Sequence, residues 1–249
     1  MAGSEEVSVR ADSIVIEDLV TEEQFREAVC VQATIWGFSE LDLLPVRFFV
    51  VASKIGGQVF GAYDDGLMVA FCLAIPGLKP DGRPYLHSHM LGVLPEYRNS
   101  GLGRRLKMHQ KDEALARGIQ LLEWTFDPLE IKNAYFNIGR LGAVVRRYVR
   151  NQYGTTSSPL TGGLPTDRCV AEWWITGSCK RGAVREGVRL PADIAAIRSG
   201  DPVRARAIQA ELADQLEAAF ARGLAVIRVE RDNAWFTYLL GELSFGEPS

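Results

Sequence analysis

The chain has 249 residues, of which 47% are hydrophobic and 24% are charged, and its formal net charge is -3 at pH 7. This length and composition predict one or two globular domains and exclude an intrinsically disordered chain, a collagen and a small disulfide-stapled scaffold. The nearly balanced charge gives no general reason to expect nucleic acid as a partner.

The cysteines and the apolar stretches indicate the cellular compartment in which the protein is expected. The four cysteines, at positions 30, 72, 169 and 179, have no short pair spacing, so we expect free, mostly buried thiols and no metal site. The start of the chain lacks the charged region and apolar run of a signal peptide, and the longest apolar stretches are too short to span a bilayer. These patterns predict a soluble, cytoplasmic protein that does not bind membranes.

The first third of the chain carries clear start and turn signals. Thr21 and Gln24 have the spacing of a capping box, and Pro45 suits the first turn of a second helix. Asp65-Gly66 fits the turn of a hairpin, where a glycine takes the positive φ. The predicted elements are, in order, a strand over residues 13–20, a helix after Thr21, a helix after Pro45, and strands over 58–63 and 67–75.

The remaining elements alternate more regularly. Asp127 is expected to cap a helix, and the basic, glycine-rich segment 177–190 is expected to be a linker after a loop over 154–166. The other predicted elements are strands over 84–94, 119–126, 144–153, 169–176, 224–230 and 234–240, and helices over 102–117, 127–141, after Pro191 and after Pro202.

This order predicts an α/β (α+β) fold with a mixed, partly antiparallel central sheet flanked by helices. We expect a catalytic domain over residues 1–176 and a small C-terminal α-α-β-β module over 177–249. Val226, Trp235 and Tyr238 are too apolar for a free surface, so this module should form a homodimer contact or a wall of the substrate site.

The most informative stretch is residues 91–106, LGVLPEYRNSGLGRRL. A strand runs into a turn containing Gly101 and Gly103, and a helix begins directly after it. Backbone N–H groups converge at such a helix N-terminus, where the helix dipole favours negative charge, and glycines allow a pyrophosphate to approach closely. Leu106 stands where a Rossmann motif needs its third glycine, and the G-K-[ST] of a P-loop is absent.

The R-x-x-G-x-G formed by Arg98, Gly101 and Gly103 after V-L-P-E-Y resembles motif A of the GNAT superfamily of acyl-CoA-dependent N-acyltransferases. The resemblance covers about residues 13–153. Motif B of the family is similar to residues 133–142, in which Ala134 and Gly142 stand at the family's Ala and Gly positions.

The resemblance implies acetyl-CoA or another acyl-CoA as cosubstrate, no metal, and two central strands that splay apart to admit the thioester. The backbone of Leu91 and Val93 would pair with the amides of the pantetheine arm, and the amides from Arg98 to Arg104 would hold the pyrophosphate. The residues implied for cofactor binding are Leu91, Gly92, Val93, Arg98, Asn99, Ser100, Gly101, Leu102, Gly103, Arg104 and Asn133.

The proton donor departs from the family pattern. Many relatives carry a tyrosine four residues before the motif B glycine, as general acid for the leaving thiolate, and this position is Ile138 here. Tyr135 lies one helical turn earlier and could replace it only if the helix were rotated.

Two kinds of residue are candidates for the general base. His87 and His89 lie on one face of the strand before motif A, either beside the thioester or as hydrogen-bonded core or rim histidines. Together they would need a third ligand to bind a metal, and the sequence offers none. Glu123, an acid in an apolar strand, is the second candidate base, or else it faces solvent.

Arg146, Arg147 and Arg150 follow motif B. Alternation along a strand would place them on both faces, either in contact with the 3′-phosphate of CoA or an acidic substrate, or in solvent. The resemblance implies transfer of an acyl group, expected to be acetyl, from acyl-CoA to the amine of a small molecule or amino acid by direct attack. The alternative is an acyl-CoA-binding or regulatory protein whose catalysis has lapsed.

Overall fold

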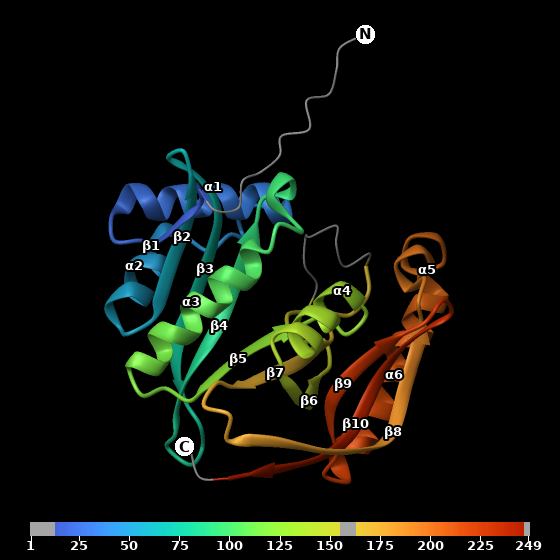
Figure 1. The fold of residues 1–249 in the computed structure, drawn as a ribbon. Coiled ribbons are helices and arrows are strands. Elements are labelled where there is room, and N and C mark those ends of the chain that lie inside the picture. The colour runs from blue at the N-terminus through green and yellow to red at the C-terminus, as the bar shows by residue number, and fades with distance from the viewer. Residues whose placement is uncertain (1–12, 155–162, 247–249) are drawn as a thin grey trace. The chain divides into compact units, whose positions relative to one another are not determined.

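The computed structural model describes residues 13–154 and 163–246 (Figure 1). These residues group into two units: unit 1 is Met1–Pro76 with Ser88–Ala114, and unit 2 is Gly77–His87 with Leu115–Ser249. Most of the loop predicted over 154–166 lies outside the described residues. The predicted domain boundary at 176/177 stays a prediction.

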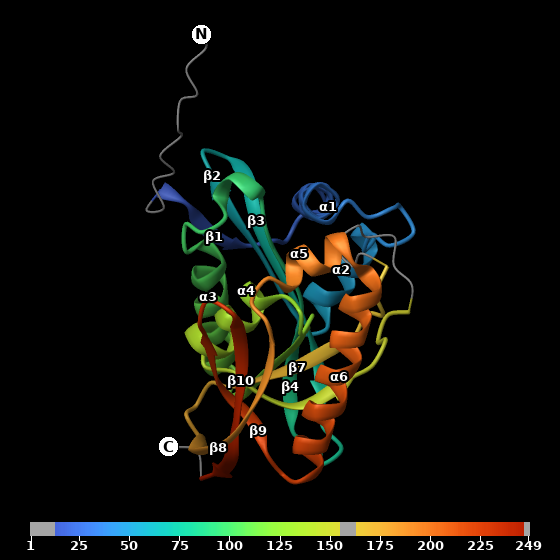
Figure 2. The same cartoon turned by 90° about the vertical axis from the view of Figure 1, so that its right-hand side faces the viewer.

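Unit 1 begins as the capping signals predict. The Thr21 hydroxyl accepts the Gln24 amide at 3.2 Å, and the Gln24 side chain accepts the Thr21 amide at 3.0 Å, so the capping box is complete. The helix that it starts, α1, spans Glu22–Trp36, and α2 spans Val46–Lys54 directly after Pro45. Both helices lie on one face of the unit 1 strands in Figure 2, and α3 lies on the other.

The strands of unit 1 form a sheet in the order β1-β2-β3-β4. The turn between β2 and β3 uses positive φ at Asp65 (46°) and Gly66 (81°), as the hairpin signal predicts. The core between sheet and helices is apolar and includes Phe25, Phe49, Phe60 and Phe71. The elements are β1 (Val15–Asp18), β2 (Gln58–Asp64), β3 (Leu67–Leu78), β4 (Pro84–Val93), a 3₁₀ turn (Pro95–Tyr97) and α3 (Leu102–Ala116).

Unit 2 continues from the start of β4, where Leu86 and His87 pair in parallel with Leu122 and Glu123 of β5. From there the order is β5-β7-β6-β9-β10-β8, and the pairs from β5 onward are antiparallel. The strands are β5 (Leu121–Phe126), β6 (Val144–Val149), β7 (Arg168–Trp174), β8 (Cys179–Pro191), β9 (Ala225–Arg231) and β10 (Trp235–Phe245). The helices are α4 (Ile131–Ala134), which continues as a π-helix over Tyr135–Arg140, α5 (Ile194–Gly200) and α6 (Pro202–Ala221). The predicted mixed sheet with flanking helices is confirmed.

Two local predictions are wrong, and the start of a third element is displaced. The expected linker over 177–190 is β8, an edge strand that pairs with β10 and whose exposed positions carry charged residues, a common way to protect a sheet edge. Pro191 is the last residue of this strand, and the helix predicted after it, α5, begins at Ile194. Asp127 does not cap a helix: it accepts the Leu129 amide at 2.8 Å and pairs with Arg198, and α4 begins four residues later.

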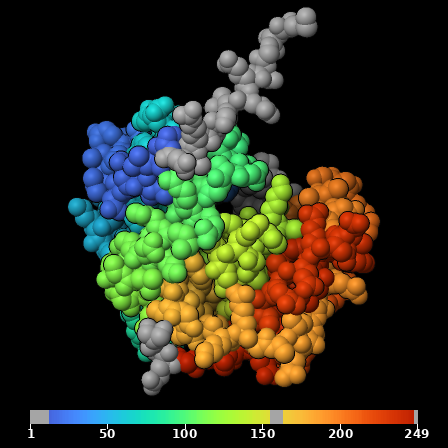
Figure 3. All heavy atoms as spheres, viewed as in Figure 1, coloured from blue at the N-terminus to red at the C-terminus, as the bar shows by residue number. Residues whose placement is uncertain are grey.

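The C-terminal elements pack within unit 2. Val226 and Tyr238 are fully buried, Val226 pairs with Val145 of β6, and the Tyr238 hydroxyl donates to the Pro128 carbonyl at 2.6 Å. Trp235 remains 41% exposed. Figure 3 shows the atoms of the last strands directly against those of the α4 region. The predicted homodimer stays a prediction.

Candidate active site

The turn between β4 and α3 has the backbone conformation that its glycines suggest. Asn99 (φ 64°) and Gly101 (φ 87°) lie in the left-handed region, so the chain reverses sharply before the helix begins at Leu102. The Ser100 hydroxyl donates to the Tyr97 carbonyl at 2.7 Å and thereby closes the loop. We call residues 98–104 the α3 loop.

The α3 loop leaves several donors available. The Leu102 amide bonds to Ser100 Oγ at 3.4 Å and the Arg104 amide to the Gly101 carbonyl at 3.0 Å. The amides of Ser100, Gly101 and Gly103 have no acceptor within the described part of the chain. Free amides at the N-terminus of a 15-residue helix form an anion-binding site, so the loop fits a pyrophosphate group.

Two glycines of this region serve different ends. A Cβ on Gly103 would lie 3.6 Å from Leu91 Cδ2 and 3.9 Å from Val93 Cγ2, at ordinary contact distance, so the protein's own packing does not require glycine there. A Cβ on Gly92 would lie 2.7 Å from Ile35 Cδ1, so this glycine admits α1. Room at Gly103 is what close approach of a ligand to the backbone needs.

The backbone of Val93, one of the two strand residues predicted to pair with the pantetheine arm, is partly available. Val93 is half-buried at the end of β4, and its carbonyl accepts Arg98 Nε at 3.2 Å. A carbonyl oxygen has two lone pairs, so this bond leaves one position for a further donor. Asn133 of motif B is exposed on α4, in unit 2.

The two candidate histidines belong to different units. His87 pairs in register with Glu123 of β5 in unit 2. His89 is half-buried in unit 1, and its ring centroid lies 6.1 Å from that of Phe48. Burial lowers the pKa of His89 below the ordinary value of 6.5, so its imidazole is neutral at pH 7.

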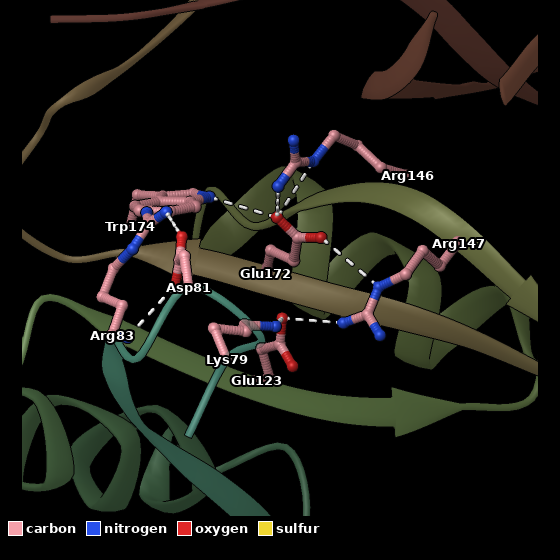
Figure 4. Close-up of polar contacts among 8 residues, drawn as sticks. All are labelled: Lys79, Asp81, Arg83, Glu123, Arg146, Arg147, Glu172 and Trp174. Atoms are coloured by element: carbon pink, nitrogen blue, oxygen red, sulfur yellow. Dashed lines mark hydrogen bonds and ion pairs between the residues drawn. The ribbon is translucent and has the colours of Figure 1, made fainter. Parts of the chain in front are cut away.

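The alternative that Glu123 faces solvent is wrong, because this residue is only 3% exposed. Its Oε1 accepts Lys79 Nζ and also Arg147 Nη2, the latter at 2.8 Å. The residue opposite it on β7 is a second buried acid, Glu172, which is 2% exposed. Figure 4 shows the two carboxylates near each other, with Arg146 and Arg147 above them and Lys79 beside Glu123.

Glu172 has its own partners. Arg146 donates to Glu172 Oε2 through Nε (3.0 Å) and Nη2 (2.5 Å), and Trp174 Nε1 lies 3.3 Å from the same oxygen. Arg147 Nε lies 3.7 Å from Oε1. A hollow of about 610 Å³ opens above this group, which we call the charged pocket; it is lined by Lys79, Pro80, Asp81, Arg83, Arg146, Arg147, Glu172 and Trp174.

The predicted alternation of the arginines across the two faces of the strand is wrong for Arg146 and Arg147. The β6–β7 register shifts between Val145 and Arg147, a β-bulge that lets the consecutive residues Arg146 and Arg147 reach the same two carboxylates. Arg150 lies apart and pairs with Asp214 and Glu217 of α6.

The candidate proton donors face different surroundings. Ile138 is 1% exposed and belongs to the core, whereas Tyr135 is 47% exposed, with the Arg140 guanidinium 5.4 Å from its ring centroid. The π-helix changes the angle between residues three apart, so Tyr135 does not take the direction of position 138. The structure therefore does not bring Tyr135 to the place that the resemblance gives to the family's tyrosine.

The sequence missed Lys79, Arg83, Glu172 and Trp174. Glu172 carries the signal that singled out Glu123, an acid inside an apolar strand (CVAEWW beside LLEWTF), and could have been found by it. The others come from the β3–β4 turn and the end of β7, and only the strand order places them together. Among the helices of the described residues, none is long and apolar enough to cross a membrane.

The comparisons with known proteins first define the class. The Escherichia coli ribosomal-protein-S18-alanine N-acetyltransferase has a TM-score of 0.51 at 22% identity, with 65% of this chain and 94% of that one covered. Arabidopsis thaliana Naa50, in complex with a bisubstrate analogue, gives 0.50 at 17% identity over 64% and 97%. Salmonella typhimurium yncA, with acetyl-CoA, gives 0.52 at 14% identity over 66% and 94%. These likenesses show the acetyltransferase fold.

The family follows from the sequence match. Residues 20–136 match the model of the acetyltransferase (GNAT) family. The resemblance drawn from motif A is confirmed: the segment that contains it matches the family's model, and the fold is that of the acetyltransferases. No curated protein sequence matches the chain significantly.

Proposed function

We propose that the protein transfers an acetyl group from acetyl-CoA to the amine of a small molecule or amino acid, by direct attack within a ternary complex. The observation that carries this proposal is the α3 loop, whose amides at Ser100, Gly101 and Gly103 are available at a helix N-terminus. These amides would hold the pyrophosphate, and Leu91 and Val93 would pair with the pantetheine arm. Acetyl-CoA supplies an activated acyl group as a thioester.

The reaction needs a group that accepts a proton from the acceptor. The amine nitrogen attacks the thioester carbonyl, the carbon–sulfur bond breaks, and the nitrogen gives up a proton as the amide forms. We assign the base to His89, because its lowered pKa keeps the imidazole neutral at pH 7. Glu123 is the weaker candidate, since its Oε1 is already bound by two cations.

The leaving thiolate has no assigned proton donor. Ile138 lies in the core and Tyr135 points elsewhere, so we propose that CoA leaves as the thiolate. A thiol has an ordinary pKa of about 8.5, so its anion is a good leaving group near neutral pH.

The test is release of free CoA thiol from acetyl-CoA in the presence of a panel of amines. We expect thiol release that depends on the amine and falls by about 10²-fold in kcat in His89→Ala. Thermal stabilisation by acetyl-CoA without thiol release for any amine would overturn the assignment in favour of a binding protein whose catalysis has lapsed.

A further inference from the structure

The charged pocket of unit 2 has features that a purely structural ion cluster does not need. Glu123 and Glu172 are buried side by side in a sheet, although burying charge is costly and apolar residues of similar size would serve stability as well. What the two carboxylates do accomplish is to fix the guanidinium groups of Arg146 and Arg147 next to each other.

The bulge in β6 points to the same end. In a regular strand Arg146 and Arg147 would lie on opposite faces, and the register shift puts both over the two glutamates instead. Neighbouring guanidinium groups repel each other, and an additional anion bound to both would reduce this repulsion. Bulges that redirect side chains are common beside binding sites.

The arginines retain donors for a ligand. Arg146 uses Nε and Nη2 for Glu172, and Arg147 uses Nη2 for Glu123. Neither Nη1 group has an acceptor among the residues described by the structure, and both side chains are about half exposed along the pocket. Nitrogen pairs of this kind bind carboxylates and phosphates through two parallel hydrogen bonds.

The local charge and shape fit a small anion. Lys79, Arg83, Arg146 and Arg147 face three carboxylates (Asp81, Glu123 and Glu172), which leaves one positive charge in excess. The Arg83 guanidinium lies 5.1 Å from the centroid of the Trp174 ring, so an aromatic face adjoins the cations. The hollow of about 610 Å³ has the size of a small-molecule site.

We propose that the charged pocket binds a carboxylate or phosphate group of a small ligand, and that this group belongs to the amine acceptor. The enzyme would therefore select acidic amines. Arg146 and Arg147 would hold the anion, and Glu123 and Glu172 would act as positioning residues for them. The assignment to the acceptor rests on the proposed function, whereas anion binding itself does not.

Anion binding is tested first, on the full chain and without turnover. Titration calorimetry at constant ionic strength would use succinate and inorganic phosphate as probes and succinamide as the neutral control. The variant is Arg146→Gln/Glu172→Gln, which removes an ion pair together and leaves no buried carboxylate without its cation. Arg83→Gln is a second variant at the rim, where its partner Asp81 is exposed. The matched control is Arg150→Gln, which directly follows the same strand but is paired with α6.

We expect the double variant to weaken succinate binding at least 10-fold, Arg83→Gln to weaken it less, and Arg150→Gln to bind succinate as the wild type does. Equal binding by wild type and double variant, no binding of either anion, or equal binding of succinamide would overturn the site.

The source of the anion is tested by transfer rates. Amines with a carboxylate are compared with their carboxamides, and CoA with dephospho-CoA. We expect kcat/KM to favour the carboxylates at least 10-fold in the wild type, and the double variant to lose that preference while binding acetyl-CoA unchanged. If the double variant instead changes the ratio of affinities for CoA and dephospho-CoA, the anion belongs to the cosubstrate and the acceptor assignment is wrong. If no amine is acetylated while succinate binding still depends on the pair, the proposed function fails and the anion site stands.

Discussion

The α3 loop and the charged pocket both suit negative charge, but they use different parts of the chain to do so. In the loop the donors are backbone amides at a helix N-terminus, and the only special side-chain requirement is the absence of a Cβ. In the pocket the donors are arginine side chains, which two buried glutamates hold in place. A backbone site offers a fixed geometry at little electrostatic cost, whereas a side-chain site requires buried counter-charges to hold it rigid.

The largest effect is expected from a substitution that disrupts only the backbone site. Gly103→Val would place a branched side chain beside the free amides, so we expect the Kd for acetyl-CoA to rise at least 10²-fold. The wild type should gain about 2.7 kcal/mol of stability at a ligand concentration of 100 times its Kd, and the variant almost none. Differential scanning fluorimetry with and without acetyl-CoA measures this gain.

Gly103→Ala is the graded control, because a Cβ there makes only ordinary contacts with Leu91 and Val93. The Tm of both variants without ligand should stay within a few degrees of the wild type. Unchanged acetyl-CoA affinity in Gly103→Val would show that the amides of the α3 loop do not hold the cosubstrate.

The second effect separates the histidine of unit 1 from the acid of unit 2. His89→Ala should lower kcat about 10²-fold with little change in acetyl-CoA binding. Because burial lowers the pKa of His89 below 6.5, the wild-type rate should fall only at more acidic pH, and this acidic limb should disappear in the variant. The measurement is kcat against pH.

His87→Ala and Glu123→Gln are the comparison variants. We expect a smaller loss in His87→Ala and no change of the pH profile in Glu123→Gln. A wild-type rate in His89→Ala together with a lost rate in Glu123→Gln would move the base to unit 2.

The third effect concerns a buried charge in unit 1 that is bound by neutral side chains, whereas the buried glutamates of unit 2 are bound by cations. Lys107 of α3 is 3% exposed, and its Nζ donates to Ser88 Oγ at 2.7 Å and to Gln110 Oε1 at 3.1 Å. Burial lowers its pKa from 10.5 to about 8. The unfolded chain therefore binds the proton more tightly, and the wild type becomes more stable as pH rises from 8 towards 10.5.

Urea unfolding of wild type and Lys107→Met across this range isolates the effect. The difference in free energy of unfolding should change in favour of the wild type by up to about 1.4 kcal/mol per pH unit. A difference that stayed constant with pH would show that folding does not lower the pKa of Lys107.

The smallest effect is expected at Arg150, which directly follows β6 and lies outside the charged pocket. Its partners Asp214 and Glu217 are on the surface of α6, and exposed ion pairs contribute about 0–1 kcal/mol. Arg150→Gln should therefore lower the free energy of unfolding by less than about 1 kcal/mol and leave transfer unchanged. A loss of several kcal/mol would indicate that the β6–α6 contact is a main support of unit 2.

The comparison also explains what the sequence could predict. The α3 loop is encoded locally: Gly101 and Gly103 lie close together where a strand runs into a helix, and this local context predicts backbone capture of an anion. The capping box at Thr21 and the hairpin turn at Asp65 are local in the same way, and all three are found in the structure.

The charged pocket could not be predicted because nothing local encodes it. Lys79, Glu123, Arg147 and Glu172 come from four segments, and they meet only because β7 lies between β5 and β6 and β6 bulges at Arg146. The π-helix that separates Tyr135 from Ile138 has no sequence signal either. The basic, glycine-rich sequence of the edge strand β8 predicts a linker, but exposed charges are also what protects a sheet edge.

Amide hydrogen exchange across the α3 loop tests the central claim most directly. The amides of Ser100, Gly101 and Gly103 have no acceptor in the described chain, so they should exchange rapidly in the free protein. Saturating acetyl-CoA should slow their exchange selectively in the wild type, while acetyl-CoA added to Gly103→Val at the same concentration should not. Rapid exchange at all three amides with acetyl-CoA bound would contradict backbone capture of the cosubstrate and with it the account of this site.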